Sequence, residues 1–137
     1  MKVKKSKFDS SHICIFVDSK SEKYEELLPT FEKHGLAFKQ GKFIFFDVDN
    51  LKSGGYYTKN ALTFIEAHEI AHSVLKHTKS SPLVEAEADF LAVLLCKDYG
   101  FESSAKFGIS EFKSRNNIAF NSFSKKYKSG IIKRIKN

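Results

Sequence analysis

Hydrophobic positions along the N-terminal half of the chain follow patterns typical of short strands and one helix. The β-branched and aromatic run ICIFV at 13–17 predicts a buried strand, although so short an apolar run is also compatible with a helix. Residues 21–34 have helical spacing, but Pro29 inside them predicts a kink or two shorter helices. The segment LAFKQGKFIFFDV at 36–48 has two apolar runs around Gln40 and Gly41, which predicts a β-hairpin.

Three later segments have helical spacing, after a glycine-rich stretch at 49–60 that predicts a loop. In the first, residues 60–76, the apolar side chains and both His68 and His72 fall within one arc of about 120°, which predicts that both histidines point inward. Ser81 followed by Pro82 is a good start signal for a second helix, which is expected to reach about residue 97. A third helix is expected over 110–123. The whole pattern predicts an α+β fold, a short sheet or hairpin packed on helices.

Length and composition favour one compact domain over residues 1–137. No apolar run approaches 18 residues, so a membrane span is not expected, and the run at 13–17 is too short for a signal peptide. The two cysteines, Cys14 and Cys96, are expected to be buried thiols in a reducing cytoplasm.

The positive charge of the chain lies at its two ends. The formal net charge is +7, yet residues 122–137 contribute +6 and the first seven residues +4, so the remaining chain is acidic. Residues 1–10 and 124–137 are therefore expected to be basic, mobile ends. Such ends can contact nucleic acid or an acidic partner, but solvated lysine-rich termini are the simpler interpretation, since the chain uses lysine far more than arginine.

The stretch His68-Glu69-Ile70-Ala71-His72 has the spacing by which a helix binds zinc. Two histidines four residues apart lie on one face, so that both rings reach one ion. A catalytic zinc has three protein ligands and a water, and Glu69 at the edge of the face can accept a proton from that water. The sequence therefore predicts His68 and His72 as zinc ligands and Glu69 as the general base.

The next helix offers the third ligand. Glu85 and Asp89 are four apart on one face, which suits Glu85 as a ligand and Asp89 as the acceptor of an imidazole N–H. Glu87 lies about 200° from Glu85 on a helix, so only one of the two can address the metal, and Glu87 is the alternative ligand. An acidic first turn is also a common feature of helices that bind nothing.

Other candidate ligands are rejected. Cys96 lies about 16 Å further along its helix. His77 is placed on the wrong face, and the extended metzincin motif would require glycine at 75 and histidine at 78. His12 and His34 have no partner at ligand spacing. The donor that would stabilise an oxyanion has no spacing signal, and Tyr56, Tyr57 and His77 are its only candidates.

The segments ALTFIEAHEIAHSVLKH and EAEADFLAVLLC resemble the ImmA/IrrE family of zinc metallopeptidases. Asp89 stands where that family usually has asparagine, and FGISEFKSR at 107–115 is similar to a later family segment. The resemblance spans about residues 35–115. It implies a small zincin-like domain, zinc bound by His68, His72 and Glu85, catalysis by Glu69, and cleavage of helix-turn-helix repressors.

We therefore expect a cytoplasmic zinc-dependent endopeptidase that cuts a regulatory protein, with a helix-turn-helix repressor as its partner. The alternative is a non-enzymatic module that associates with a partner or with DNA and in which zinc is structural or absent. Glu69 discriminates between them, because a purely structural zinc site needs no carboxylate there and favours a fourth protein ligand.

Overall fold

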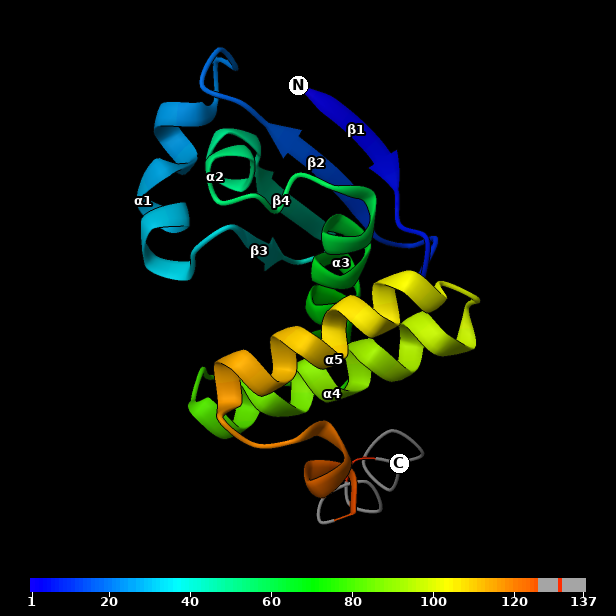
Figure 1. Cartoon of the computed structure of the whole chain (residues 1–137). Helices are drawn as coiled ribbons and strands as arrows, with labels where there is room; N and C mark the ends of the chain where they lie inside the picture. The colour runs from blue at the N-terminus through cyan, green and yellow to red at the C-terminus, as the bar shows by residue number, and fades with distance from the viewer. Residues whose placement is uncertain (126–130, 132–137) are drawn as a thin grey trace. The chain divides into compact units, whose positions relative to one another are not determined.

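A computed structural model describes residues 1–125 and 131 and has an α+β fold (Figure 1). The chain divides into two compact units, residues 1–62 and 63–137. The assignment of residues 1–137 to one domain stays a prediction. Among the described residues, no helix is both long and apolar enough to cross a membrane.

The first unit is built on a four-stranded mixed sheet with the order β1-β2-β4-β3, in which β1 is Lys2–Lys5. β2 (Ile13–Val17) pairs in parallel with β4 (Phe43–Asp47), and β3 (Ala37–Gln40) and β4 form the predicted antiparallel hairpin. Gly41 in its turn has φ of +58°, a conformation that glycine adopts without strain. The strand at 13–17 and the hairpin are thus confirmed.

Helix α1 (Tyr24–His34) packs on this sheet and continues through Pro29, so of the two predicted effects of the proline the division into two shorter helices is wrong, and the kink stays a prediction. Phe31 of the helix is buried in one cluster with Val17 and Phe38 of the strands. This burial stabilises the helix where the proline removes one hydrogen bond. The periodicity of 21–34 therefore identified the helix, and its contact with the sheet determined that it is a single one.

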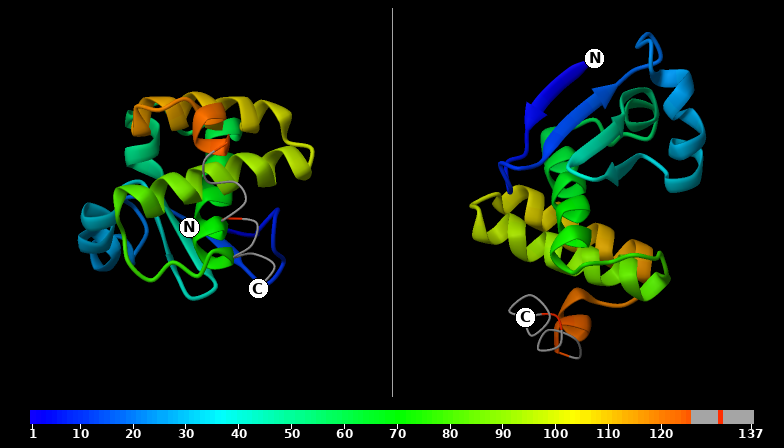
Figure 2. Two further views of the ribbon diagram at one scale, coloured as in Figure 1. Left: turned by 90° about the horizontal axis from the view of Figure 1, so that it is seen from below. Right: turned by 180° about the vertical axis from the view of Figure 1, so that it is seen from behind.

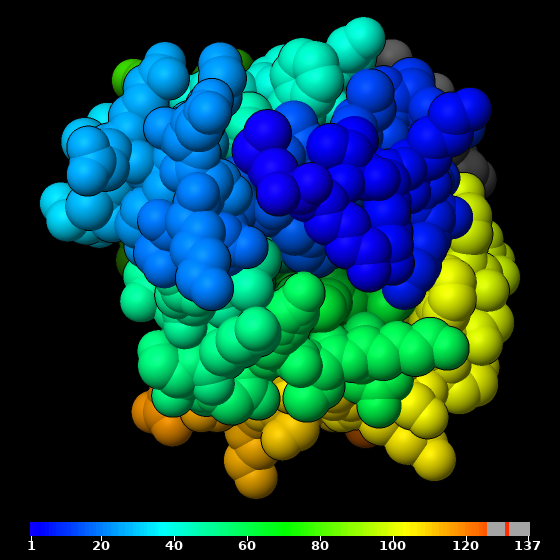
Figure 3. Space-filling view, turned by 90° about the horizontal axis from the view of Figure 1, so that it is seen from above, coloured from blue at the N-terminus to red at the C-terminus, as the bar shows by residue number. Residues whose placement is uncertain are grey.

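Two other segments of the first unit differ from expectation. β1 (Lys2–Lys5) pairs antiparallel with β2, so part of the expected mobile end at 1–10 is a strand. Its side chains stay exposed, and Figure 3 shows this blue N-terminal segment at the surface. α2 (Val48–Ser53) occupies part of the expected loop, because the Asp47 side chain accepts a hydrogen bond from the backbone N–H of Asn50 and Leu51 is fully buried.

Helices α4 (Pro82–Asp98) and α5 (Glu102–Asn116) dominate the second unit and lie side by side in both Figure 1 and Figure 2. They are joined by a short turn in which Gly100 has φ of +82°. Gly108 of α5 allows a close approach, because a Cβ there would lie 2.9 Å or less from side-chain atoms of Phe64 and Val93. α4 begins at Ser81 and Pro82 as predicted.

The prediction of a helix over 110–123 is wrong in its boundaries. α5 begins eight residues earlier and ends at Asn116, and the next residue, Asn117, adopts a left-handed conformation with φ of +52°. A separate helical stretch starts at residue 120, and its Phe120 and Phe123 pack against Phe90 and Phe112. Most of the expected basic end at 124–137, residues 126–130 and 132–137, lies outside the described residues.

Candidate metal centre

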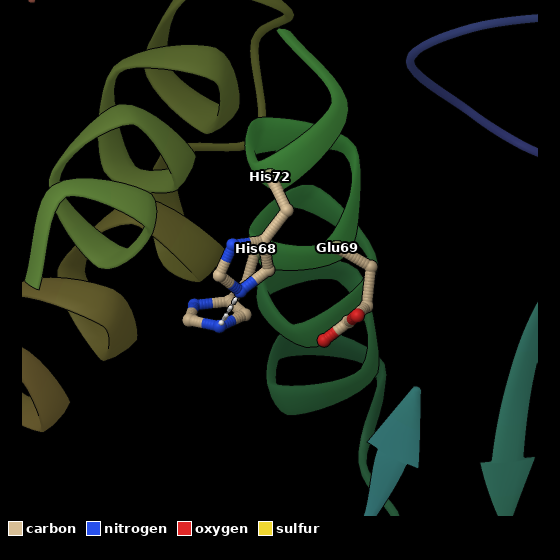
Figure 4. A group of neighbouring side chains, drawn as sticks. All are labelled: His68, Glu69 and His72. Atoms are coloured by element: carbon tan, nitrogen blue, oxygen red, sulfur yellow. Dashed lines mark hydrogen bonds between the residues drawn. The ribbon is translucent and has the colours of Figure 1, made fainter. Parts of the chain in front are cut away.

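Helix α3 (Lys59–Val74) carries His68 and His72 one turn apart on the same face. Their ring centroids are 4.6 Å apart and their Nε2 atoms 3.0 Å apart, as the dashed line in Figure 4 shows. His68 is 8% exposed and His72 is partly buried. The inward orientation predicted from the helical arc is therefore correct for both rings.

Helix α4 brings the carboxylate of Glu85 to the same point. Its Oε1 lies 3.4 Å from Nε2 of His68, and its Oε2 lies 3.1 Å from Nε2 of His72. Ser81 caps this helix by accepting a hydrogen bond from the backbone N–H of Val84, which fixes the turn on which Glu85 stands. The three side chains predicted as ligands thus converge in the structure.

Asp89, one turn further along α4, is almost fully buried behind His68. Its Oδ1 accepts a hydrogen bond of 2.7 Å from Nδ1 of His68 and one of 3.1 Å from Arg115 on α5. Oδ2 faces the side-chain amide of Asn116 at 3.5 Å. A charged acceptor on Nδ1 keeps the proton on that nitrogen and leaves Nε2 with a lone pair. This geometry is the one expected of Asp89 from the sequence.

His77 and Glu87 lie differently from the sequence-based expectation. A continuous helix would place His77 on the wrong face, but α3 ends at Val74 and Lys76 has φ of +57°. The turn brings Nδ1 of His77 within 2.9 Å of Nδ1 of His72, while its Nε2 lies 3.0 Å from Oε1 of Glu87. Neither residue reaches the metal-binding point by these contacts. Both are nevertheless part of the cluster.

The remaining sequence candidates are placed as follows. His12 pairs with Asp9 in the first unit at 3.0 Å, and His34 ends α1. Tyr56 and Tyr57 also belong to the first unit. Both ring nitrogens of His77 are within hydrogen-bonding distance of partners, so His77 is a poor candidate for an oxyanion donor.

The residues fit a zinc ion. If Asp89 and His77 each accept an Nδ1–H proton, both Nε2 atoms present lone pairs to one another at 3.0 Å, beside a carboxylate. Such an arrangement requires a cation or an extra proton between the lone pairs. Ligands of a tetrahedral zinc at 2.0–2.1 Å lie roughly 3.3–3.4 Å from one another. The observed separations of 3.0, 3.1 and 3.4 Å are close to that value.

The electrostatics also favour positive charge at this point. Burial lowers the pKa of His68, but hydrogen bonds to Asp89 and Glu85, and the nearby charge of Glu69, raise it to about 10. Hydrogen bonds from His68 and His72 in turn hold the pKa of Glu85 well below its ordinary value. The cluster therefore stabilises either an imidazolium or a bound cation.

Glu69 lies beside the two rings on α3. One ligand atom each of His68, Glu69 and His72 fall within 4.8 Å of one another. Figure 4 shows Glu69 leaving the flank of the helix, whereas the two histidines share one face. Because Glu85 contacts both Nε2 atoms at 3.4 Å or less, Glu85 is the better candidate for the third ligand.

From the sequence, Arg115 had no assigned role, and His77 was considered only as a rejected ligand and a candidate oxyanion donor. Arg115 bridges Asp89 to Glu111, and its position corresponds to the last residue of the FGISEFKSR segment. His77 was visible only as a histidine five residues after His72, and no local pattern shows that the chain turns back there.

Comparisons with known proteins identify no relative. No protein-family model matches the chain, and no curated protein or solved structure matches it. The resemblance to the ImmA/IrrE family therefore rests on the motifs alone.

Proposed function

We propose that the chain is a zinc-dependent endopeptidase with a zincin-like catalytic site. The observation that carries the proposal is the convergence of three ligand atoms, from His68, His72 and Glu85, at separations of 3.0–3.4 Å, with Glu69 beside them. Glu69 also argues against the non-enzymatic alternative, because a structural zinc site has no use for a carboxylate at that position.

The chain's own residues divide the chemistry between them. A zinc ion in this site supplies Lewis acidity, which makes a water molecule more acidic and polarises a carbonyl group. His68, His72 and Glu85 hold the ion, and Asp89 orients His68. Glu69 takes the proton of the attacking water and passes it to the nitrogen of the leaving amine, so that the peptide C–N bond breaks and one water is consumed.

The substrate that we propose is a helix-turn-helix repressor, cut at one site in the cytoplasm. This proposal comes from the resemblance of the two motif helices to the ImmA/IrrE family. The structure adds one supporting detail. In Asp89, Oδ1 accepts the hydrogen bonds of both His68 and Arg115, so the asparagine usual in the family can make the same two contacts. Aspartate in place of the family's asparagine at position 89 is therefore compatible with the same metal site.

The function is tested first by metal content and then by a single isosteric substitution. The purified chain is expected to bind about one zinc, measured by elemental analysis. Glu69→Gln is expected to retain that zinc and to lose cleavage of the repressor by about 10²–10⁴-fold, because the amide cannot accept the proton. Cleavage is measured with wild type and Glu69→Gln on a repressor encoded beside this chain.

Two results would contradict the proposal. Retained turnover in Glu69→Gln would exclude the mechanism, and absence of zinc from the folded wild-type chain would exclude the site. Digestion of unrelated unfolded proteins at many positions, with the repressor left intact, would instead leave a general peptidase without the regulatory role.

A further inference from the structure

The segment that follows α3 returns to the metal centre instead of leaving it. The backbone N–H of His77 donates to the carbonyl oxygen of His72 at 3.0 Å, and the left-handed conformation of Lys76 produces this reversal. The imidazole of His77 ends up 5% exposed, and its centroid lies 5.1 Å from that of His72. A buried histidine in contact with a candidate zinc ligand requires a polar partner on each ring nitrogen.

The Glu87 carboxylate indicates which ring nitrogens of His77 and His72 carry a proton. Oε1 of Glu87 lies 3.0 Å from Nε2 of His77, and an ionised carboxylate only accepts, so Nε2 of His77 carries the proton. If the ring carries only this proton, Nδ1 of His77 has a lone pair. In the contact of 2.9 Å between the two Nδ1 atoms, His72 is therefore the donor and His77 the acceptor. A neutral His72 with its proton on Nδ1 has a lone pair on Nε2.

We propose that His77 and Glu87 form a positioning pair that holds His72 in its metal-binding tautomer. The inference rests on the proposed zinc site and extends it. In this arrangement both histidine ligands are oriented in the same way. Asp89 accepts the Nδ1–H of His68, and His77 accepts the Nδ1–H of His72. Glu87, which the sequence offered as an alternative ligand, acts on the metal centre through His77.

The pair affects zinc affinity because the other tautomer of His72 cannot bind the ion. Without an acceptor at Nδ1, His72 can place its proton on Nε2, toward the carboxylate of Glu85 at 3.1 Å. Zinc would then have to displace that proton from Nε2, and the proton would move to Nδ1 or to solvent. Loss of a partner that orients a metal ligand typically costs 10–100-fold in affinity.

The test uses the full chain and two separate measurements. Long-range ¹H–¹⁵N spectra of the metal-free chain report which nitrogen of each imidazole carries the proton, and competition with a chromophoric chelator gives the zinc affinity. In wild type, His72 is expected to carry its proton on Nδ1. His77→Phe is expected to lose that signature and about 10–100-fold in affinity.

Two further substitutions separate positioning from simple packing. The side-chain oxygen of His77→Asn can lie where Nδ1 of His77 was, so this variant is expected to regain both the tautomer and most of the affinity. Glu87→Gln is expected to give a mixture of tautomers and a smaller loss of affinity, because an amide can either donate or accept. It also keeps the test available if His77→Phe does not fold.

A matched control exists in the other compact unit, where His12 contacts a carboxylate oxygen of Asp9 at 3.0 Å. His12→Phe is expected to change neither the spectrum of His72 nor zinc affinity. The proposal is overturned if folded His77→Phe and Glu87→Gln both keep the wild-type tautomer of His72. It is also overturned if His77→Phe binds zinc as tightly as His12→Phe does.

These outcomes differ from a failure of the proposed function. If the chain shows the Nδ1–H signature of His72 but binds no zinc, the proposed metallopeptidase function is refuted. The proposal that His77 and Glu87 position a zinc ligand is then refuted as well, although the hydrogen bonds between these residues are confirmed. A chain that binds zinc and cleaves its substrate, but has Nε2–H on metal-free His72, refutes the positioning pair alone.

Discussion

Substitution of Asp89 tests how the candidate metal centre holds its first histidine. The carboxylate is 1% exposed and accepts hydrogen bonds of 2.7 Å from His68 and 3.1 Å from Arg115. Both contacts are to Oδ1. Asp89→Ala removes the acceptor completely, whereas Asp89→Asn can keep an oxygen at the same position and removes only the charge.

The size of each effect follows from these contacts. A hydrogen bond to a charged group contributes about 1.5–3 kcal/mol, and the guanidinium of Arg115 is exposed enough to be rehydrated, so Asp89→Ala should cost about 3 kcal/mol of folding free energy. Asp89→Asn should cost about half of that, since both bonds persist without charge assistance. For zinc affinity we expect a loss of about 10–100-fold with alanine and clearly less with asparagine.

The assays are urea unfolding of the metal-free chain and zinc titration against a competing chelator. Equal losses of zinc affinity in Asp89→Ala and Asp89→Asn would show that the negative charge, and not the acceptor oxygen at Nδ1, holds His68. Unchanged affinity in a folded Asp89→Ala variant would refute the positioning argument altogether.

Three further predictions address the ligand set and the scaffold. Glu85→Ala should lower zinc content sharply, whereas Glu87→Ala should still bind one zinc per chain at saturating concentration; elemental analysis showing the reverse would move the third ligand to Glu87. Gly108→Ala should cost about 1–3 kcal/mol in urea unfolding, because its Cβ would lie 2.5 Å from a ring carbon of Phe64, and an unchanged midpoint would contradict the close packing. Ser81→Ala should cost about 1 kcal/mol, because α4 loses the hydrogen bond at its first turn, and a thermal midpoint equal to that of wild type would contradict this cap.

Sequence-based prediction was most accurate where the signal was local. The start of α4 follows from the side-chain oxygen of Ser81 and the fixed φ of Pro82, both of which act within one turn. The pairing of His68 with His72 follows from helical geometry alone. The hairpin at 37–47 needed only two apolar runs and a glycine in the turn. These features could be predicted because neighbouring residues determine them.

Boundaries that depend on burial were predicted less well. Pro29 does not divide α1 into two helices, because Phe31 packs on the sheet. The cap by Asp47 and the burial of Leu51 stabilise α2 where the sequence predicted a polar loop. The end of α5 depends on the left-handed conformation of Asn117 and on the aromatic side chains that follow it. Local spacing cannot report such contacts, because their partners lie far away in the sequence.

The sequence by itself identified the candidates for the metal site, which are His68, His72 and either Glu85 or Glu87, because residues four apart on a helix occupy one face. Only the tertiary structure favours Glu85 over Glu87. Both are on α4, and it is the packing of that helix against α3 that directs Glu85 to the two Nε2 atoms and Glu87 to His77. The role of His77 likewise depends on a chain reversal at Lys76. Helical spacing cannot predict this reversal, because α3 has already ended at Val74.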